Sequence, residues 1–178
     1  MVAIRDEGGR FDGSIETVWR FVNNPDAHGH AHKSTRNRKA QTVDGTTLML
    51  SMERNWMGKW VKVGTRLTVL PPLGVVSEFV EGPFAGSKMF TVYTPESETS
   101  TRVDVFGDFK SPVLRPEDVE RGARAWLEEA YNEDAPAIRK LQFGELDASA
   151  IGGEIADPAA AQPIAPRTNP TPVTNKTG

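Results

Sequence analysis

The sequence PEDVERGARAWLEEAYNEDAPAIRKL, residues 116–141, decides the fold because it reads as one long amphipathic helix. Pro116 suits the first position of a helix, and Glu117 and Asp118 complement the positive end of the helix dipole. Apolar residues recur at helical spacing along the stretch: Val119, Ala123, Trp126, Leu127, Ala130, Ala137, Ile138 and Leu141. Pro136 lies inside this pattern and predicts a kink or a split. A lone long helix must bury its apolar stripe against another layer, which the preceding residues have to supply.

A shorter helix is predicted at residues 14–22, where the sequence reads SIETVWRFV. The Ser14 hydroxyl can accept a hydrogen bond from a free amide at the start of this helix. A buried stripe is formed by Ile15, Val18, Trp19 and Val22. Pro25 ends the helix, because the residue before a proline disfavours helical angles. A second short helical or irregular segment is expected at 26–32, and a short strand at 2–4, before a glycine pair at 8–9.

From residue 38 the pattern changes to the apolar–polar alternation of β-strands. Strands are predicted at 48–56, 59–70, 74–80, 87–93 and 101–109. The separators are rich in proline and glycine, and Asp44-Gly45 is a strong hairpin signal. We therefore predict an α+β fold in which a curved antiparallel sheet wraps around the C-terminal helix, with two short helices after the first strand. Such a sheet leaves a pocket between itself and the helix.

Composition excludes several classes of function. The 178 residues carry a net charge of −3 and no block of like charge, which argues against a nucleic-acid partner. The chain has no cysteine, so disulfides and thiolate metal sites are excluded. No apolar run is long enough to cross a membrane, and no secretion signal is evident, so we expect a cytoplasmic protein. Residues 1–143 are predicted to form one domain, and the Pro/Ala/Thr-rich residues 144–178 a disordered tail.

All three histidines lie within five residues, at His28, His30 and His32. At a spacing of four residues on a helix, His28 and His32 share a face, which suits either metal binding or general acid–base chemistry. A third ligand for such a metal site would be a carboxylate such as Glu53, whose proximity the sequence does not establish. A polar loop with solvent-facing histidines is the alternative. We expect no metal and no other cofactor, and we name His28 and His32 as candidate acid–base residues.

The stretch RNWMGKW at 54–60 combines aromatic and cationic residues between two predicted strands. Trp56 and Trp60 are candidates for lining a pocket and stacking on a flat ligand. Arg54 shares its strand face with Leu50 and Met52, so a concave placement would bury its charge and require an anionic or carbonyl partner on the ligand. The alternative is that the tryptophans pack in the core or at the rim, with Arg54 outside.

Other strand residues with polar side chains give weaker predictions. Alternation places Asp104 and Asp108 opposite apolar neighbours, so both should face solvent. Glu78 shares a face with Val76 and Val80 and is an inward candidate. Tyr93 is a possible proton donor or a wall aromatic. No phosphate-binding loop and no Gly-x-Ser-x-Gly motif is present.

The run SIETVWRF at 14–21 resembles the first-helix signature of the SRPBCC (START-like, polyketide cyclase/dehydrase) superfamily, which has a small residue followed by a Val-Trp pair. Residues 71–86, with PPLG, EF and GPFAG, and residues 99–104 are similar to its middle and late strands. The resemblance covers about residues 2–142 and implies a helix-grip fold with a deep cavity. The superfamily includes lipid and hormone carriers, polyketide aromatases and cyclases, other cofactor-free enzymes and metal-holding oxygenase domains. It shares no catalytic motif that can be transferred here.

Together these observations predict a domain that binds a hydrophobic, aromatic or polycyclic small molecule. The predicted ligand-binding residues are Trp56, Trp60, Glu78 and Trp126. The first alternative is a cofactor-independent cyclase, dehydratase or lyase, with His28 or His32 as general base and Arg54 or Tyr93 stabilising negative charge. The second alternative is a protein-interaction module, which would have a filled cavity and an exposed apolar patch. The sequence leaves the oligomeric state open.

Overall fold

The computed structural model describes residues 1–56 and 58–145, without the side chains of residues 25–27. Its elements are β1 (Val2–Phe11), α1 (Ile15–Val22), α2 (Pro25–Ala31), β2 (Thr35–Thr42), β3 (Thr47–Trp56), β4 (Lys59–Leu70), β5 (Gly74–Glu81), β6 (Lys88–Ser97), β7 (Ser100–Phe109) and α3 (Pro116–Gln142). The tail predicted to be disordered lies, from residue 146 onward, outside the described residues. No described helix is long and apolar enough to cross a membrane.

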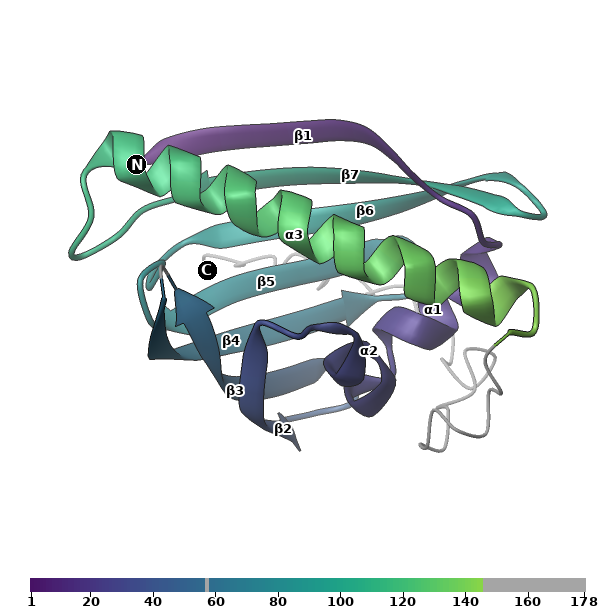
Figure 1. Ribbon diagram of the computed structural model, residues 1–178, viewed down its shortest axis with the longest axis horizontal. Coiled ribbons are helices and arrows are strands. Elements are labelled where there is room, and N and C mark those ends of the chain that lie inside the picture. The colour runs from purple at the N-terminus through teal and green to yellow at the C-terminus, as the bar shows by residue number, and fades with distance from the viewer. Residues whose placement is uncertain (57, 146–178) are drawn as a thin grey trace, which may run out of the picture.

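The strands form one seven-stranded antiparallel sheet in the order β1-β7-β6-β5-β4-β3-β2. From β2 to β7, strands that follow one another in the sequence are neighbours in the sheet. β1 pairs instead with β7, the last strand, and α1 and α2 lie between β1 and β2 in the sequence. α3 lies across the concave side of the curved sheet, and α1 and α2 lie near its C-terminal half (Figure 1). This architecture confirms the predicted α+β helix-grip fold.

The start of α1 is tied to the end of α3. The Ser14 hydroxyl accepts a hydrogen bond from the Thr17 amide at 3.2 Å, as predicted for a helix cap. The side-chain carbonyl oxygen of Gln142 accepts hydrogen bonds from the Ser14 amide at 2.9 Å and from the Thr17 hydroxyl at 2.7 Å. These bonds hold the two helices together at one end of the sheet.

α3 continues through Pro136 without a break, so the predicted split is wrong. Proline removes one helical hydrogen bond, but packing on both sides of it keeps the helix in place. Ile138 is fully buried, and Ala135 and Ala137 pack against the same cluster of α1 and strand residues. Tertiary contacts therefore outweigh the local cost of the proline.

The core consists of two apolar clusters, one toward each end of α3. The first contains Ile4, Phe79, Phe84, Val105, Phe109, Val119, Ala123 and Leu127. The second contains Phe11, Val18, Trp19, Phe21, Tyr93, Val103 and Ile138. Members of both clusters also face the space between sheet and helix, so the core forms the walls of the candidate site.

β1 is longer than the predicted strand, because it passes through the glycine pair with a shift in register instead of ending there. At this bulge the Gly8 amide donates a hydrogen bond to the Asp104 carboxylate at 2.8 Å. Asp104 also pairs with Arg102 and is only 7% exposed, so its predicted solvent exposure is wrong. Asp108 is exposed, as predicted.

Candidate functional site

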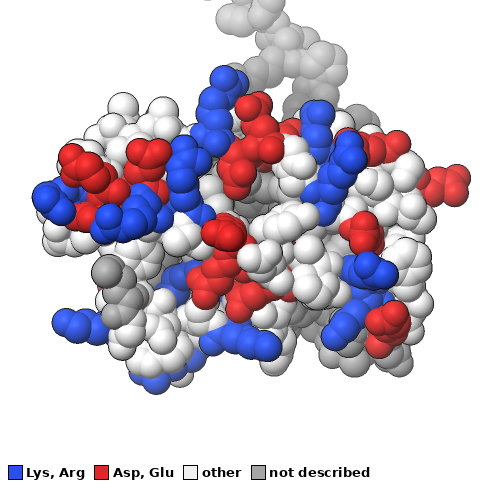
Figure 2. Space-filling model, turned by 45° about the horizontal axis from the view of Figure 1, so that its top comes forward, with Lys and Arg blue, Asp and Glu red and all other residues white. Residues whose placement is uncertain are grey.

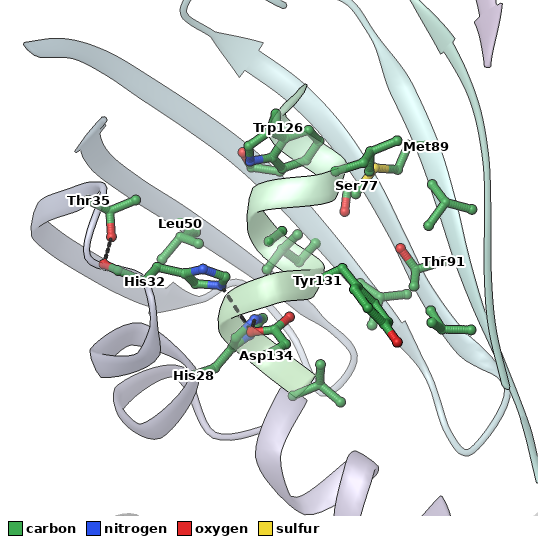
Figure 3. A pocket seen from close by; sticks show the side chains of 18 of the residues that line it. His28, His32, Thr35, Leu50, Ser77, Met89, Thr91, Trp126, Tyr131 and Asp134 are labelled. Atoms are coloured by element: carbon green, nitrogen blue, oxygen red, sulfur yellow. Dashed lines mark hydrogen bonds and ion pairs between the residues drawn. The ribbon is translucent and has the colours of Figure 1, made fainter. Parts of the chain in front are cut away.

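A cavity of about 740 Å³ lies between the concave side of the sheet and α3. Alternate residues of β3 to β7 face it, among them Leu50, Ser77, Phe79, Thr91, Tyr93 and Val103. α3 contributes Trp126, Tyr131 and Asp134 to the lining, and Asp134 lies beside the two histidines His28 and His32 (Figure 3). The walls are therefore mainly apolar and aromatic, with scattered hydroxyl groups.

One end of the cavity is polar, because α2, β2, β3 and α3 each bring a charged or titratable side chain to it. His28 and His32 both lie beside Asp134 (Figure 3). The distance from Asp134 Oδ1 is 3.4 Å both to His28 Nε2 and to His32 Nε2. Arg38 and Arg54 line the same end. The structure thus brings together residues that are about 100 positions apart in the sequence.

His32 is held in place by α3. Its Nδ1 lies 2.8 Å from Glu133 Oε2, and the other carboxylate oxygen of Glu133 accepts a hydrogen bond from the Lys33 amide at 3.0 Å. Burial lowers the pKa of His32 below its usual value, and the neighbouring His28 lowers it further, while Asp134 and Glu133 raise it. Because the lowering effects dominate, the neutral imidazole is favoured.

Arg38 is a cavity residue that the sequence analysis missed. The β2–β3 register shifts between Arg36 and Lys39, and Asn37 adopts a φ of 53°, a backbone region that asparagine tolerates. This bulge turns Arg38 toward the cavity, where burial lowers its pKa. Its Nε is buried without a hydrogen-bond partner among the described residues. An Arg-Asn-Arg-Lys run in an edge strand gave no signal for this inward turn.

Arg54 shares a strand face with Leu50 and Met52, as predicted, and this face, whose orientation the sequence left open, lines the cavity. The positive charge of Arg54 already has a partner within the protein, however, because its guanidinium forms an ion pair with Glu129 of α3. The guanidinium also lies over the Trp126 ring, 5.4 Å from the ring centre. The proposed need for an anionic ligand group at Arg54 is therefore corrected, since the protein itself supplies the partner.

The three predicted tryptophans have different positions. Trp126 lines the cavity and packs edge-on against Phe79 at 5.2 Å. Trp56 lines only a smaller space of about 50 Å³ on the far side of Trp126, where it packs edge-on against Phe84 at 5.0 Å. Trp60 is 40% exposed and carries the Arg36 guanidinium 4.1 Å above its ring. The prediction that Trp60 lines the pocket is wrong.

Glu78 does not face the cavity, which corrects its prediction as an inward residue. β5 presents Val75, Ser77 and Phe79 to the cavity, so Glu78 lies on the opposite face, where it pairs with Lys88 and, at 3.6 Å, with Arg66. These partners lower its pKa, and the hydrogen bond to Lys88 contributes most. The alternation was recognised correctly, but the concave face was assigned to the wrong set of residues.

Tyr93 is a cavity wall residue, buried to 7% exposure and packed edge-on against Trp19 at 6.4 Å. Burial raises the pKa of its phenol, and the negative charge of Asp134 adds to the effect. The hydroxyl therefore stays protonated and can donate a hydrogen bond to a ligand, but it cannot act as a phenolate base.

Glu53, the carboxylate named as an example of a third metal ligand, lies away from the histidines. It accepts hydrogen bonds from Arg36 at 2.8 Å and from Asn37 at 2.9 Å. Asp134 takes the expected place beside His28 and His32. A signal for Asp134 was present in the sequence, because it follows Leu127, Ala130 and Tyr131 at helical spacing on the side of α3 that faces the sheet.

Charged side chains of both signs surround the opening of the fold. In Figure 2, acidic side chains gather near the middle of one face, with basic side chains on both sides. Because neither sign dominates this face, the outer field gives little steering to a charged ligand. Selectivity is expected to arise inside the cavity.

A curved antiparallel sheet closed by a long C-terminal helix around a cavity defines the helix-grip class of proteins. The chain has this SRPBCC-type, START-like fold, and solved structures share it at low sequence identity. A di-domain aromatase/cyclase, BexL of the BE-7585A biosynthetic pathway, aligns with a TM-score of 0.63 and 10% identity over 79% of this chain and 50% of that one. This chain thus spans about half the length of that protein.

Two further structures match over nearly their whole length. The Zhui aromatase/cyclase from Streptomyces sp. R1128 has a TM-score of 0.59 and 11% identity over 83% of this chain and 93% of that chain. A START superfamily protein from Mycobacterium smegmatis has a TM-score of 0.61 and 18% identity over 81% of this chain and 99% of that chain. No family model and no curated protein matches the sequence.

Proposed function

We propose that residues 1–143 form a binding domain for a flat, largely apolar small molecule that carries carbonyl or hydroxyl groups. The observation behind this proposal is a cavity of about 740 Å³ with aromatic walls and one polar end. Its volume falls within the roughly 300–1,000 Å³ that is typical of small-molecule sites. The fold is shared with aromatase/cyclases and a START superfamily protein, which agrees with a hydrophobic ligand.

The arrangement of the walls suggests how such a ligand would lie. Burial of its apolar rings against Trp126, Tyr131 and Phe79 would contribute about 25 cal/mol per Å² of apolar area. The Arg38 Nε–H and the protonated Tyr93 hydroxyl are donors for a ligand oxygen. A ring system with oxygen substituents at one end fits these apolar walls and polar donors better than a uniformly apolar chain does. The open cavity also argues against the interaction module, which required a filled one.

Partial filling of the cavity should weaken ligand binding. The probe is N-phenyl-1-naphthylamine, a neutral aromatic dye whose fluorescence rises in apolar surroundings. Leu50 faces the cavity (Figure 3), and we expect Leu50→Trp to reduce the affinity about fivefold, or about 1 kcal/mol, because the larger side chain takes up space that the dye would occupy. Fluorescence titration of the full-length protein measures the dissociation constant.

The matched control is Ser51→Trp, which adds a tryptophan at the next residue of the same strand. Ser51 is exposed on the opposite face, so its affinity for the dye should stay within twofold of the unsubstituted protein. Equal affinities in both variants, or no dye binding by the unsubstituted protein, would contradict the proposed cavity function.

A second candidate function is cofactor-independent acid–base catalysis on the bound molecule. The observation that favours it is the placement of His28 and His32 at the cavity wall beside Asp134. Histidine beside a carboxylate is a common general base, and the apolar walls would keep water from the reacting atoms.

This second function is tested with 5-nitrobenzisoxazole, a flat aromatic compound with one acidic C–H bond. Base attack breaks this C–H bond, its electron pair forms the nitrile as the N–O bond breaks, and the proton remains on the base while a coloured phenolate is released. We expect His28→Ala/His32→Ala to lose about 100-fold in rate, within the usual range for a positioned base. Rates are measured on EDTA-treated protein. A His30→Ala variant, at an exposed position, should react like the unsubstituted protein, and an unaltered rate in the double variant would remove both histidines from the mechanism.

A further inference from the structure

We propose that His28, His32 and Asp134 form a site for a first-row divalent metal ion, such as Zn²⁺ or Fe²⁺, at the polar end of the cavity. One ligand atom from each residue is available, and these atoms all lie within 4.8 Å of one another. The inference does not depend on the identity of the organic ligand. It revises the sequence-based expectation of no metal, for which no carboxylate could be placed beside the histidines.

The distances suit coordination. Asp134 Oδ1 lies 3.4 Å from Nε2 of both His28 and His32. Two ligand atoms bound tetrahedrally to one zinc ion at roughly 2.0–2.1 Å are themselves about 3.4 Å apart. The ligand atoms lie within 4.8 Å of one another, so the two imidazoles need to approach each other by at most about 1.4 Å to complete the site. The ring centres are 4.8 Å apart, with His28 in α2 and His32 directly after it, and side-chain rotation allows this approach.

Asp134 has a buried carboxylate oxygen that is not satisfied by a hydrogen bond within the described part of the chain. Its Oδ1 is buried and has no hydrogen-bond partner among the described residues, although both imidazoles are near. A buried carboxylate oxygen without a partner is costly, and such atoms call for a specific explanation. A bound cation between this oxygen and the two imidazole nitrogens would satisfy it.

The surroundings of His32 resemble those of a metal ligand. Its Nδ1 is 2.8 Å from Glu133, which places the ring proton on Nδ1 and leaves the Nε2 lone pair directed at Asp134. A carboxylate on the far nitrogen orients a ligating histidine and raises its basicity.

The local charge also favours a cation. Arg38 and Arg54 bring two positive charges to this end of the cavity, and Glu129, Glu133 and Asp134 bring three negative ones. Glu129 is paired with Arg54, so Glu133 and Asp134 are left to offset Arg38 and an added ion. Two arginines and three carboxylates sum to a net charge of −1 for these five side chains, before any ion is added.

Two imidazoles and one carboxylate on one side of an ion leave its remaining positions open toward the cavity. This donor set suits Zn²⁺, Fe²⁺, Co²⁺ or Ni²⁺ and is a poor match for Ca²⁺ or Mg²⁺, which prefer oxygen ligands. The open positions face the space proposed for the organic molecule, so a ligand oxygen could bind the metal directly.

The test is a titration of EDTA-treated full-length protein with CoSO₄, followed by calorimetry and by the visible absorption of Co²⁺. We expect one ion per chain and absorption bands that report nitrogen and oxygen ligands. His28→Ala, His32→Ala and Asp134→Asn should each weaken binding by at least about 100-fold. His30→Ala, which changes an exposed histidine of the same helix, should leave the affinity within twofold.

Further variants keep the test decisive if an Asp134 or histidine variant folds poorly by circular dichroism. Glu133→Gln should weaken Co²⁺ binding about 10- to 100-fold, as is usual for a partner of a ligating histidine. No Co²⁺ binding, or unchanged affinity in the well-folded ligand variants, would overturn the proposal. Binding of N-phenyl-1-naphthylamine by the metal-free protein would continue in that case, so failure of the metal site is distinguished from failure of the cavity function.

Discussion

Replacing Phe109 with alanine is expected to lower the free energy of unfolding by about 3–5 kcal/mol, the usual cost of removing a buried phenylalanine ring. Phe109 is fully buried in β7. Its ring packs against Phe79 at 6.0 Å, Phe84 at 5.6 Å and Trp126 at 6.5 Å. One side chain therefore joins β7, β5 and α3, and its loss would leave a void between the sheet and the helix.

The control is Phe106→Ala on the same strand. Phe106 is half-buried on the opposite face, where the Arg5 guanidinium lies 5.5 Å from its ring centre. We expect a loss of about 1 kcal/mol, as for a partly exposed side chain. Chemical denaturation measures both changes in unfolding free energy. The comparison requires that the slope of this free energy against denaturant concentration is the same for all three proteins. A loss at Phe109 no larger than that at Phe106 would contradict the role assigned to this cluster.

Much of the fold was predictable because its signals are local. The cap at Ser14, the proline and glycine turns and the alternation of the strands each depend on neighbouring residues only. The predicted strand at 59–70 has the bounds of β4, and the long helix was placed to within one residue of α3. The antiparallel meander also followed, since short turns join antiparallel neighbours, whereas the pairing of β1 with β7 was not predicted.

The wrong predictions concern features that the apolar–polar alternation along a strand does not encode. Alternation separates two faces of a strand but does not state which face is concave, so Glu78 was assigned to the wrong side. The bulge beside Asn37 reverses the phase locally and brings Arg38 inward. Bulges of this kind depend on tertiary packing, and a polar edge strand such as β2 gives no apolar pattern that would expose them.

The candidate site was predicted in part. Both histidines and Arg54 were named, but their partners Asp134, Glu133 and Glu129 were not. These partners are between 75 and 106 residues away and meet the histidines and the arginine only because α3 crosses the sheet beside α2. A helix of 27 residues carries several acidic positions, and the crossing selects which of them face the site.

Trp126→Leu is expected to weaken binding of N-phenyl-1-naphthylamine about tenfold, or about 1.4 kcal/mol. Trp126 separates the large cavity from the small space beside Trp56, since it lines both. Leucine would remove an aromatic face from the ligand, worth about 0.5–1.5 kcal/mol beyond its buried area. It would also join the two spaces, so that a small dye fits less closely.

Trp56→Leu separates this effect from a general loss of stability. Trp56 belongs to the same apolar cluster but lines only the small space, against Phe84. Both leucine variants should lose about 1–3 kcal/mol of unfolding free energy, as truncated core residues do. Only Trp126→Leu should lose affinity for the dye, and a tenfold loss in both variants would show that affinity follows stability and that Trp126 has no particular role as a cavity wall.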